Sequence, residues 1–260
     1  MERKYPLSLQ RISLLALALL LWEFLAGGIY PYEAVVDPFY ISSPTRIGHE
    51  LYELFASGEI MDDIALTLGE AFSGLILGVI SGVVIGLIFA YSETISSLLE
   101  PLMAALNSLP RVALAPLVIL WFGIGVFSKV FLSWSLVFFI IFYNTFSGVR
   151  SIDPDIINAI RIMGASRYQL MRIVVLPSVF SWIFAALRVS ISYALIGAIV
   201  GEFVGAVAGI GYQIIYAEGL LLVDRLYSLL IILAVIGIAL NEVAKRVEEK
   251  ALRWRPAVRL

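Results

Sequence analysis

The sequence predicts an all-α polytopic membrane protein with six transmembrane helices and cytoplasmic N and C termini. Hydrophobic residues make up 61% of the 260 residues and charged residues only 15%, whereas about a quarter of the residues in a soluble globular protein are charged. A helix needs roughly 20 predominantly apolar residues to cross a bilayer. Six segments meet this requirement, at about 12–29, 64–91, 98–124, 127–147, 179–204 and 224–241.

The distribution of charge predicts the orientation of these helices. The 30–63 segment carries seven acidic residues against one basic residue, Arg46. Because Lys and Arg concentrate on the cytoplasmic side of membrane proteins, this segment is expected to face outward and the basic segments inward. The basic residues are Arg3, Lys4, Arg11, Arg150, Arg161, Arg167, Arg172, Lys245, Arg246, Lys250, Arg253, Arg255 and Arg259.

The first apolar segment has two interpretations. It could be a cleaved signal peptide, but its apolar run is about 18 residues and contains Trp22 and Glu23, whereas a signal core usually has about 7–15 apolar residues. We therefore expect a retained helix. Cleavage would leave five helices in the same orientation, so charge does not decide between the two.

The acidic segment contains "SPTRIGHELYELFASG", which predicts a short amphipathic helix on the outer surface. Its apolar face is formed by Ile47, Leu51, Leu54 and Phe55. His49 is the only histidine and the chain has no cysteine, so neither an imidazole metal cluster nor thiol chemistry is expected.

Glycines recur at every fourth position in the second and fifth predicted spans. On a helix this spacing gives a stripe without side chains that lets another helix approach closely. We therefore expect these residues to pack the helix bundle. They are Gly74, Gly78, Gly82, Gly86, Gly197, Gly201, Gly205 and Gly209.

The third span contains three prolines, Pro101, Pro110 and Pro116, with Asn107 and Arg111 near the second. A proline inside a helix removes a backbone hydrogen bond and kinks or breaks the helix. The sequence thus predicts a broken segment that lines a pore or forms a gate. The alternative is a cytoplasmic interface that precedes a shorter helix.

Charged residues also occur within the predicted spans, at Glu70, Arg188 and Glu202. A charge at the centre of a bilayer costs about 2.5–3.5 kcal/mol or more unless it is paired or hydrated. These residues must therefore pair, reach the interface or line a water-filled pathway, and a Glu70–Arg188 pair is one option.

The sequence offers little support for an enzyme or a nucleic-acid-binding protein. A phosphate loop requires a Gly-Lys-Ser/Thr sequence, and no Gly-Lys pair occurs. No metal site or catalytic cluster is expected, and no basic face with interleaved aromatic residues suggests nucleic acid.

The most polar interruption of the apolar sequence is "NAIRIMGASRYQLMRIVVLP", residues 158–177. Asp153 can cap a helix that begins at Pro154, and Gly164 can end it in a left-handed conformation. A second helix is expected to begin at Ser166 and to end at Pro177. The first helix would have an apolar face formed by Ile156, Ile157, Ile160 and Met163.

This stretch resembles the cytoplasmic signature of the inner-membrane permeases of binding-protein-dependent ABC importers. Ala159, Gly164, Leu176 and Pro177 match that signature in register, and Asn158 replaces its glutamate. Over about 40–245, segments such as "SLPRVALAPLVILWFGIGVFSKV" and "AIVGEFVGAVAGIGYQI" are similar to the nitrate/sulfonate/taurine-type subfamily. That subfamily often has an arginine at the place of Glu70.

The resemblance implies a type I ABC importer permease core in the inner membrane. It implies a permease homodimer, a cytoplasmic ATPase that binds ATP and Mg, and an external substrate-binding protein; no cofactor is expected on this chain. It further implies that residues 153–177 form a coupling helix that docks on the ATPase. The residues expected to carry this coupling are Asn158, Ala159, Arg161, Gly164, Ala165, Ser166, Leu176 and Pro177.

We therefore predict three regions: residues 1–63 with the first helix and the external segment, a permease core at 64–245, and a basic tail at 246–260. The expected function is ATP-driven import of a small anion or a vitamin-like heterocycle by alternating access. The alternative is a stand-alone secondary transporter or channel, which would predict inverted repeats and ion-binding carboxylates near the membrane midplane.

Overall fold

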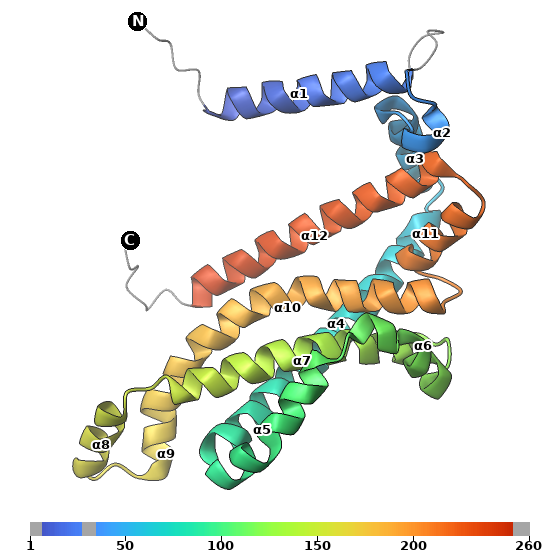
Figure 1. The fold of residues 1–260 in the computed structure, drawn as a ribbon. Helices are drawn as coiled ribbons and strands as arrows, with labels where there is room; N and C mark the ends of the chain where they lie inside the picture. The colour runs from blue at the N-terminus through green and yellow to red at the C-terminus, as the bar shows by residue number, and fades with distance from the viewer. Residues whose placement is uncertain (1–6, 28–34, 252–260) are drawn as a thin grey trace, which may run out of the picture. The chain divides into compact units, whose positions relative to one another are not determined.

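A computed structural model describes residues 7–27 and 35–251, and every regular element in these ranges is a helix (Figure 1). The all-α fold class is therefore confirmed. Arg3, Lys4, Glu33, Arg253, Arg255 and Arg259, which contribute to the charge argument, lie outside the described residues. The elements are α1 (Leu7–Ala26), α2 (Pro38–Ile41), α3 (Pro44–Ala56), α4 (Glu59–Tyr91), α5 (Glu93–Ser108), α6 (Arg111–Phe122), α7 (Val126–Arg150), α8 (Pro154–Ile162), α9 (Arg167–Leu170), the π-helical turn η1 (Met171–Val175), α10 (Leu176–Val204), α11 (Ile210–Gly219) and α12 (Val223–Ala251).

Several of these helices are long and apolar enough to cross a membrane. Among the described residues, four helices satisfy this condition, and a bent pair formed by α5 and α6 is a fifth candidate. The four are Glu59–Tyr91, Val126–Arg150, Tyr168–Val204 and Val223–Ala251. α1 coincides with most of the first predicted span. The chain is thus a multi-pass membrane protein, while the count of six spans and the cytoplasmic termini stay predictions.

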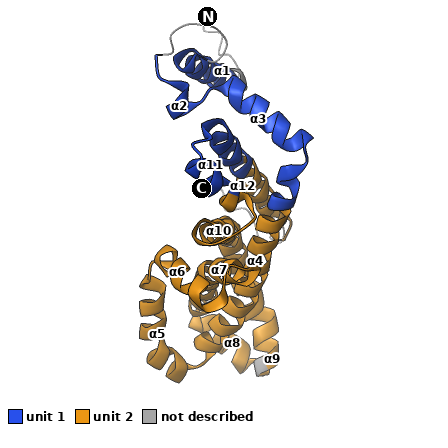
Figure 2. Ribbon diagram, turned by 90° about the vertical axis from the view of Figure 1, so that its right-hand side faces the viewer, with its two compact units in different colours: residues 1–64, 213–234 blue, residues 65–212, 235–260 orange. Residues whose placement is uncertain are grey.

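The chain divides into two compact units (Figure 2). One comprises residues 1–64 and 213–234, and the other comprises 65–212 and 235–260. Each is described by itself below. The predicted division into 1–63, 64–245 and 246–260 stays a prediction.

In the larger unit, α7 is the central helix and packs along α10. Val137 and Ile141 of α7 are fully buried, and they join Ala194 and Ala198 of α10 in one apolar cluster. A second cluster stacks aromatic rings along α7, with the rings of Phe142 and Phe146 6.0 Å apart and nearly parallel. The interior of this unit is therefore built around the two faces of α7.

The glycine stripe of α4 lies directly against α7. A β carbon at Gly78 would lie 2.6 Å from the Val137 side chain, and real β carbons do not approach that closely. The other pairs in this contact are Gly74 with Ser133, Gly82 with Ile141 and Gly86 with Thr145. The absence of four side chains is what allows the two helices to approach this closely.

The second glycine series forms a helical stripe only over its first half. Gly197 and Gly201 lie in α10 and face the Ser133 backbone and Lys129 of α7. Gly205 follows the last residue of α10 with an extended backbone, and Gly209 lies in the following turn with φ +105°. The prediction of a continuous stripe through Gly209 was wrong because α10 ends at Val204 before the series is complete.

The third predicted span is broken at one of its three prolines. α5 and α6 meet at an angle of 93°, and Leu109, which precedes Pro110, has an extended conformation with ψ 129°. A residue before proline disfavours the helical conformation, which explains the break at this position. Pro101 and Pro116 lie inside α5 and α6, so the prediction that they also break the segment was wrong; each withholds one hydrogen bond without ending its helix.

In the smaller unit, α2 and α3 are fixed to α1 by polar contacts. Trp22 donates a hydrogen bond to the Ile41 carbonyl (3.2 Å), and buried Glu23 accepts from the Thr45 hydroxyl (2.6 Å) and backbone (3.0 Å). α3 buries Ile47 and Leu54 as its amphipathic pattern predicts, but Phe55 is exposed. The predicted apolar face is therefore one residue too wide.

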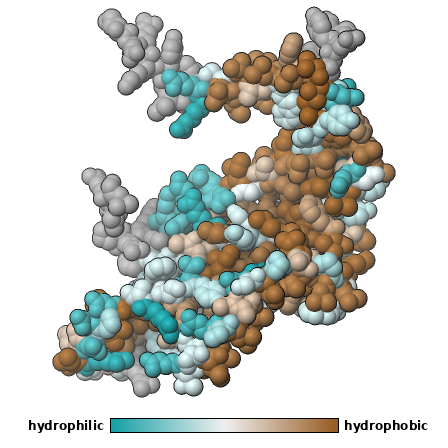
Figure 3. Space-filling view, in the orientation of Figure 1, coloured by the Kyte–Doolittle hydropathy of each residue, from teal (hydrophilic) through white to brown (hydrophobic). Residues whose placement is uncertain are grey.

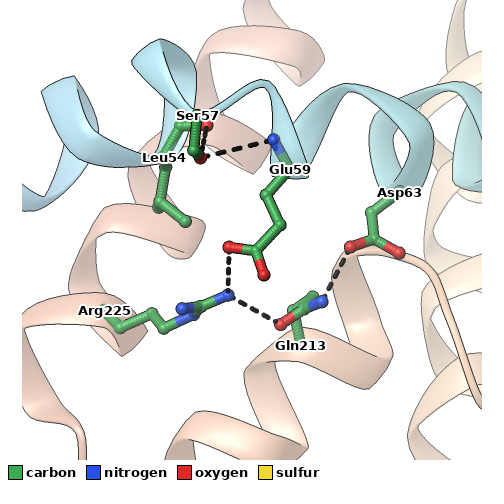
Figure 4. A network of polar contacts seen from close by, with 6 residues as sticks. All are labelled: Leu54, Ser57, Glu59, Asp63, Gln213 and Arg225. Carbon is green, nitrogen blue, oxygen red and sulfur yellow. Dashed lines mark hydrogen bonds and ion pairs between the residues drawn. The ribbon is translucent and has the colours of Figure 1, made fainter.

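A polar network joins the start of α4 to α11 and α12 in this unit (Figure 4). The Arg225 guanidinium donates to the Gln213 amide oxygen at 3.1 Å, and the Gln213 amide nitrogen donates to Asp63 at 2.8 Å. Arg225 also lies 3.6 Å from the Glu59 carboxylate. The sequence did not predict α11, the short helix that carries Gln213.

Candidate functional site

α8, the first part of the predicted coupling segment, is built by local interactions. The Asp153 carboxylate caps it by accepting a hydrogen bond from the Asp155 backbone at 2.8 Å, and Pro154 occupies the first turn, where its missing N–H is not needed. Beyond the C-terminal end, Gly164 has φ +84°. This left-handed conformation suits glycine and turns the chain toward α9.

α9 begins with a reciprocal cap. The Ser166 backbone donates to the Gln169 side chain at 2.8 Å, and the Gln169 backbone donates to the Ser166 hydroxyl at 3.3 Å. This arrangement satisfies two backbone donors that a helix N-terminus would otherwise leave unpaired. Ser166 therefore begins a helix at the position that the sequence predicts.

Pro177 does not end that helix. α9 continues through the π-helical turn η1 directly into α10, and the Leu176 backbone donates to the Met171 carbonyl five residues earlier. The wider π turn accommodates a proline, which lacks an N–H and would clash with a carbonyl in a regular α-helix. The predicted interruption at Pro177 was wrong, and the coupling segment is continuous with α10.

The two halves of the segment differ in burial. α8 has no buried residue, and Ile162 and Met163 are 86% and 84% exposed. Val174 and Val175 of η1 are instead buried. Figure 3 shows brown apolar residues among polar ones at the surface of α8. The segment is thus a helix that projects from an anchored base and presents uncovered apolar side chains.

The predicted coupling residues lie along this projection. Asn158, Ala159 and Arg161 are exposed on α8. Gly164 and Ser166 are exposed in the turn and Ala165 is half-buried, whereas Leu176 and Pro177 are half-buried at the start of α10. Their expected role is to contact a separate ATPase, so that role stays a prediction.

A second candidate site is a buried polar cluster between α4, α7 and α10. Glu202, 2% exposed, accepts hydrogen bonds from the Thr67 hydroxyl and from the Gly211 backbone, each at 2.6 Å. Thr67 in turn accepts from the Ile210 backbone at 2.9 Å. Glu202 and Thr67 thereby fix the turn that leads from α10 into α11.

Lys129 and Glu70 complete this cluster. Lys129 is also 2% exposed, and its ammonium donates to the carbonyls of Ile124 and Gly125. Glu70 interacts electrostatically with both Lys129 and Glu202, and one of its buried oxygens has no hydrogen-bond partner. Two carboxyl groups thus share one neighbouring ammonium group.

The predicted gate residues meet at the bend between α5 and α6. The Arg111 guanidinium donates to the Asn107 side chain at 3.0 Å and lies 4.4 Å from the centre of the Phe139 ring. Pro110 is exposed between them. Arg111 therefore contacts both the end of α5, through Asn107, and α7, through Phe139.

Sequence reasoning identified some of these groups but not their partners. It singled out Glu70 and Glu202 as charges that must pair, reach the interface or line a pathway, and the fold brings the two together. Glu70 does not pair with Arg188, which lies on another part of α10 in a recess with Ser192 and Asn241. Lys129 was missed, although it is the single charged residue within 127–147, a signal that could have identified it.

Comparisons with known proteins agree with this architecture. A family model described as a binding-protein-dependent transport system inner membrane component matches residues 74–251. The chain is 30% identical over 240 residues to SsuC of Bacillus subtilis, a permease protein named for aliphatic sulfonate transport, with 92% of this chain and 85% of the relative covered. It is 35% identical over 256 residues to the riboflavin transport system permease protein RibX of Chloroflexus aurantiacus, with 95% and 93% covered.

A solved structure shares the fold at low sequence identity. A bacterial ABC transporter involved in the import of the acidic polysaccharide alginate superposes with a TM-score of 0.64 at 16% identity. The match covers 94% of this chain and 97% of that chain. The helical arrangement described above is therefore one that an ABC importer uses.

Proposed function

Because the chain belongs to the family of binding-protein-dependent transport system inner membrane components and is the permease of an ABC importer, we propose that α8 and α9 couple it to a separate cytoplasmic ATPase. The observation that carries this proposal is the exposed apolar surface of α8, with Ile162 and Met163 almost fully exposed. Apolar side chains that project into water favour a partner that covers them.

The anchored base of the segment supports a mechanical role. η1 runs without a break into α10, and Val174 and Val175 are buried at this junction. α10 in turn packs along α7, the central helix. A displacement of α8 by the ATPase would therefore be passed to α10 and the bundle, which is the motion that alternating access requires.

The partners follow from this assignment. The ATPase would bind ATP and Mg and carry out hydrolysis, and this chain would bind no cofactor of its own. A second permease copy would complete the pathway, and an external substrate-binding protein would deliver the substrate. The acidic outer segment and the candidate gate at the α5–α6 bend are the parts of this chain that we assign to entry of the substrate.

We propose a small organic or inorganic anion, or a vitamin-like heterocycle, as the substrate. The relatives SsuC and RibX are named for aliphatic sulfonates and riboflavin. Both names describe small solutes, one anionic and one a heterocycle. The alternative is a stand-alone secondary transporter or channel for a small solute.

Whether the permease recruits an ATPase distinguishes an ABC importer from a stand-alone transporter or channel. The tagged full-length permease is purified from membranes together with its co-expressed ATPase, and ATP hydrolysis is measured with the binding protein and substrate. An importer permease retains the ATPase, and the variant Gly164→Glu inserts in the membrane but loses either co-purification or stimulated hydrolysis. A permease that transports its solute without retaining any ATPase would establish the alternative, and normal coupled hydrolysis in Gly164→Glu would refute the coupling role of α8.

A further inference from the structure

Glu70 is a buried acidic residue in α4 whose carboxyl group is not fully hydrogen-bonded. The residue is 2% exposed, and no donor within the described residues reaches its buried Oε2 atom. A buried carboxylate normally accepts hydrogen bonds or pairs with a cation at each oxygen, because the loss of water around an ionised group is costly. An ionised Glu70 would therefore lack donors that its charge requires.

The carboxyl groups of Glu70 and Glu202 are brought together by α4 and the end of α10. Thr67 and Glu70 are three residues apart on α4 and so lie on the same face of that helix. The Thr67 hydroxyl donates to the Glu202 carboxyl group at 2.6 Å, which places this face against Glu202. On the other side, Lys129 of α7 packs on Gly201, where a β carbon would lie 2.8 Å from the lysine side chain.

The buried charges in this place do not balance if every group is ionised. The titratable groups that face Glu70 are Glu202 of α10 and Lys129 of α7, and all three residues are 2% exposed. Two carboxylates and one ammonium group would leave one negative charge uncompensated inside the helix bundle, which is strongly unfavourable. Two carboxyl groups at one site avoid this cost by retaining a single proton between them. With that proton the three groups are neutral as a set.

The hydrogen bonds indicate which of the two carboxyl groups carries the proton. Both oxygens of Glu202 are acceptors, one from the Thr67 hydroxyl and the other from the Gly211 backbone, each at 2.6 Å. Such short distances are typical of an ionised acceptor. Glu70 instead has an oxygen that accepts nothing, and a protonated carboxyl group supplies a donor beside the Glu202 carboxylate. The proton therefore belongs on Glu70.

We propose that Glu70 and Glu202 form a binding site for one proton inside the helix bundle, with the proton on Glu70 and donated to the Glu202 carboxylate. This site goes beyond the transport function proposed above and does not depend on it. The bound proton joins α4 to the turn after α10, because Glu202 also holds that turn through Gly211. Gly209 and Gly211 have no side chain where a β carbon would meet the Glu202 carboxyl group, so the turn closes directly over the site.

The first test is infrared spectroscopy of the full-length permease at neutral pH, in a detergent that contains no ester or carboxyl group. A protonated carboxyl group has a C=O stretching band that an ionised carboxylate lacks. We expect this band in the difference between the wild type and Glu70→Gln. Glu202→Gln should also lose it, because Glu70 would then ionise beside Lys129.

The control replaces a carboxylate that has its own cation. Glu242 accepts a hydrogen bond from Arg246 at 2.9 Å and is solvent-exposed. The difference between the wild type and Glu242→Gln should therefore contain no band of a protonated carboxyl group.

The second test is thermal unfolding of the same proteins. Glu70→Gln keeps a neutral hydrogen-bond donor beside Glu202, so its unfolding midpoint should equal that of the wild type. Glu202→Gln removes the carboxylate that faces Lys129 and accepts from Thr67 and Gly211, so its midpoint should be clearly lower. If Glu70 were instead ionised and paired with Lys129, both substitutions would lower the midpoint.

Each outcome supports or overturns the proton site. A difference between the wild type and Glu70→Gln without the acid band overturns it, and this comparison does not require Glu202→Gln to fold. A band that persists in Glu202→Gln shows that burial alone protonates Glu70 and overturns the shared site. Equal losses of stability in Glu70→Gln and Glu202→Gln overturn the assignment of the proton to Glu70. The permease is measured without an ATPase, so none of these results depends on the proposed coupling.

Discussion

Replacement of Gly164 by alanine tests whether the turn between α8 and α9 sets the position of α8, the proposed coupling helix. Gly164 has φ +84°, and a β carbon built on it would meet nothing within 4 Å. The substitution therefore introduces no clash within the chain. Its whole effect should come from the backbone conformation, which disfavours residues that carry a β carbon.

The size of the expected effect on docking follows from the left-handed backbone of Gly164. A non-glycine residue in the left-handed region costs roughly 1–2 kcal/mol. α8 has no buried residue, so no buried side chain of α8 opposes its reorientation, and we expect the strain to be relieved when α8 reorients. The population with the native turn should fall about 5- to 30-fold relative to the reoriented one.

The assay is titration of the ATPase onto the full-length permease in nanodiscs, with ATP hydrolysis measured in parallel. For Gly164→Ala we expect a dissociation constant that rises about 5- to 30-fold, with unchanged membrane insertion. Asparagine tolerates the left-handed conformation better than alanine does. Gly164→Asn is therefore the matched control, and it should lose clearly less affinity for the ATPase than Gly164→Ala.

Two results would refute this reasoning. Wild-type affinity in Gly164→Ala would mean that the angle between α8 and α9 does not matter for docking. Equal losses in Gly164→Ala and Gly164→Asn would mean that the ATPase contacts this position directly and tolerates no side chain there, whatever the backbone prefers.

Three further substitutions test the packing of the spans, each by thermal unfolding in detergent. Thr67→Val removes the hydroxyl that bridges α4 to the turn after α10, and we expect a loss of about 1–3 kcal/mol; an unchanged midpoint would show that the turn does not depend on it. Lys129→Met leaves the buried carboxyl groups of Glu70 and Glu202 without a cation and should lower the free energy of unfolding by about 3–5 kcal/mol. The additional substitution Glu70→Gln should restore part of this stability, and no recovery would argue against an interaction between Lys129 and Glu70. Gly78→Ala forces a β carbon against α7 and should lower the free energy of unfolding by about 1–3 kcal/mol. The control is Gly69→Ala, whose β carbon would meet nothing within 4 Å and which should leave stability unchanged. Equal losses at both sites would contradict the close contact between Gly78 and α7.

The coupling segment could be predicted closely because it depends on neighbours in the chain. The Asp153 cap, the Ser166–Gln169 reciprocal cap and the left-handed Gly164 all involve residues within a few positions of one another. Their hydrogen bonds follow from residue type and spacing alone. The one local error was the prediction that a helix ends at Pro177. It arose because a π turn allows a helix to continue across a proline, and residue spacing in the sequence does not predict a π turn.

The membrane character was equally accessible from the sequence. Hydrophobic length and charge distribution do not depend on how helices pack, so they identified most of the long helices without the fold. Their ends were less accurate, as α12 extends to Ala251 where the apolar run stops near 241. A helix continues into water as long as its backbone hydrogen bonds do, and the polar residues of its last turns do not end it.

The sequence by itself therefore determined the class of protein, the glycine stripe of α4 and the local structure of α8 and α9, because each rests on composition or on contacts between near neighbours. Only the tertiary structure decided which buried charges meet. It brought Glu70 and Glu202 together with Lys129 and placed Arg188 elsewhere, in a recess beside Ser192 and Asn241, although all four charged residues lie in apolar helices. The physical reason is that the cost of burying a charge depends on what faces it, and residues far apart in the chain face one another only after the helices have packed.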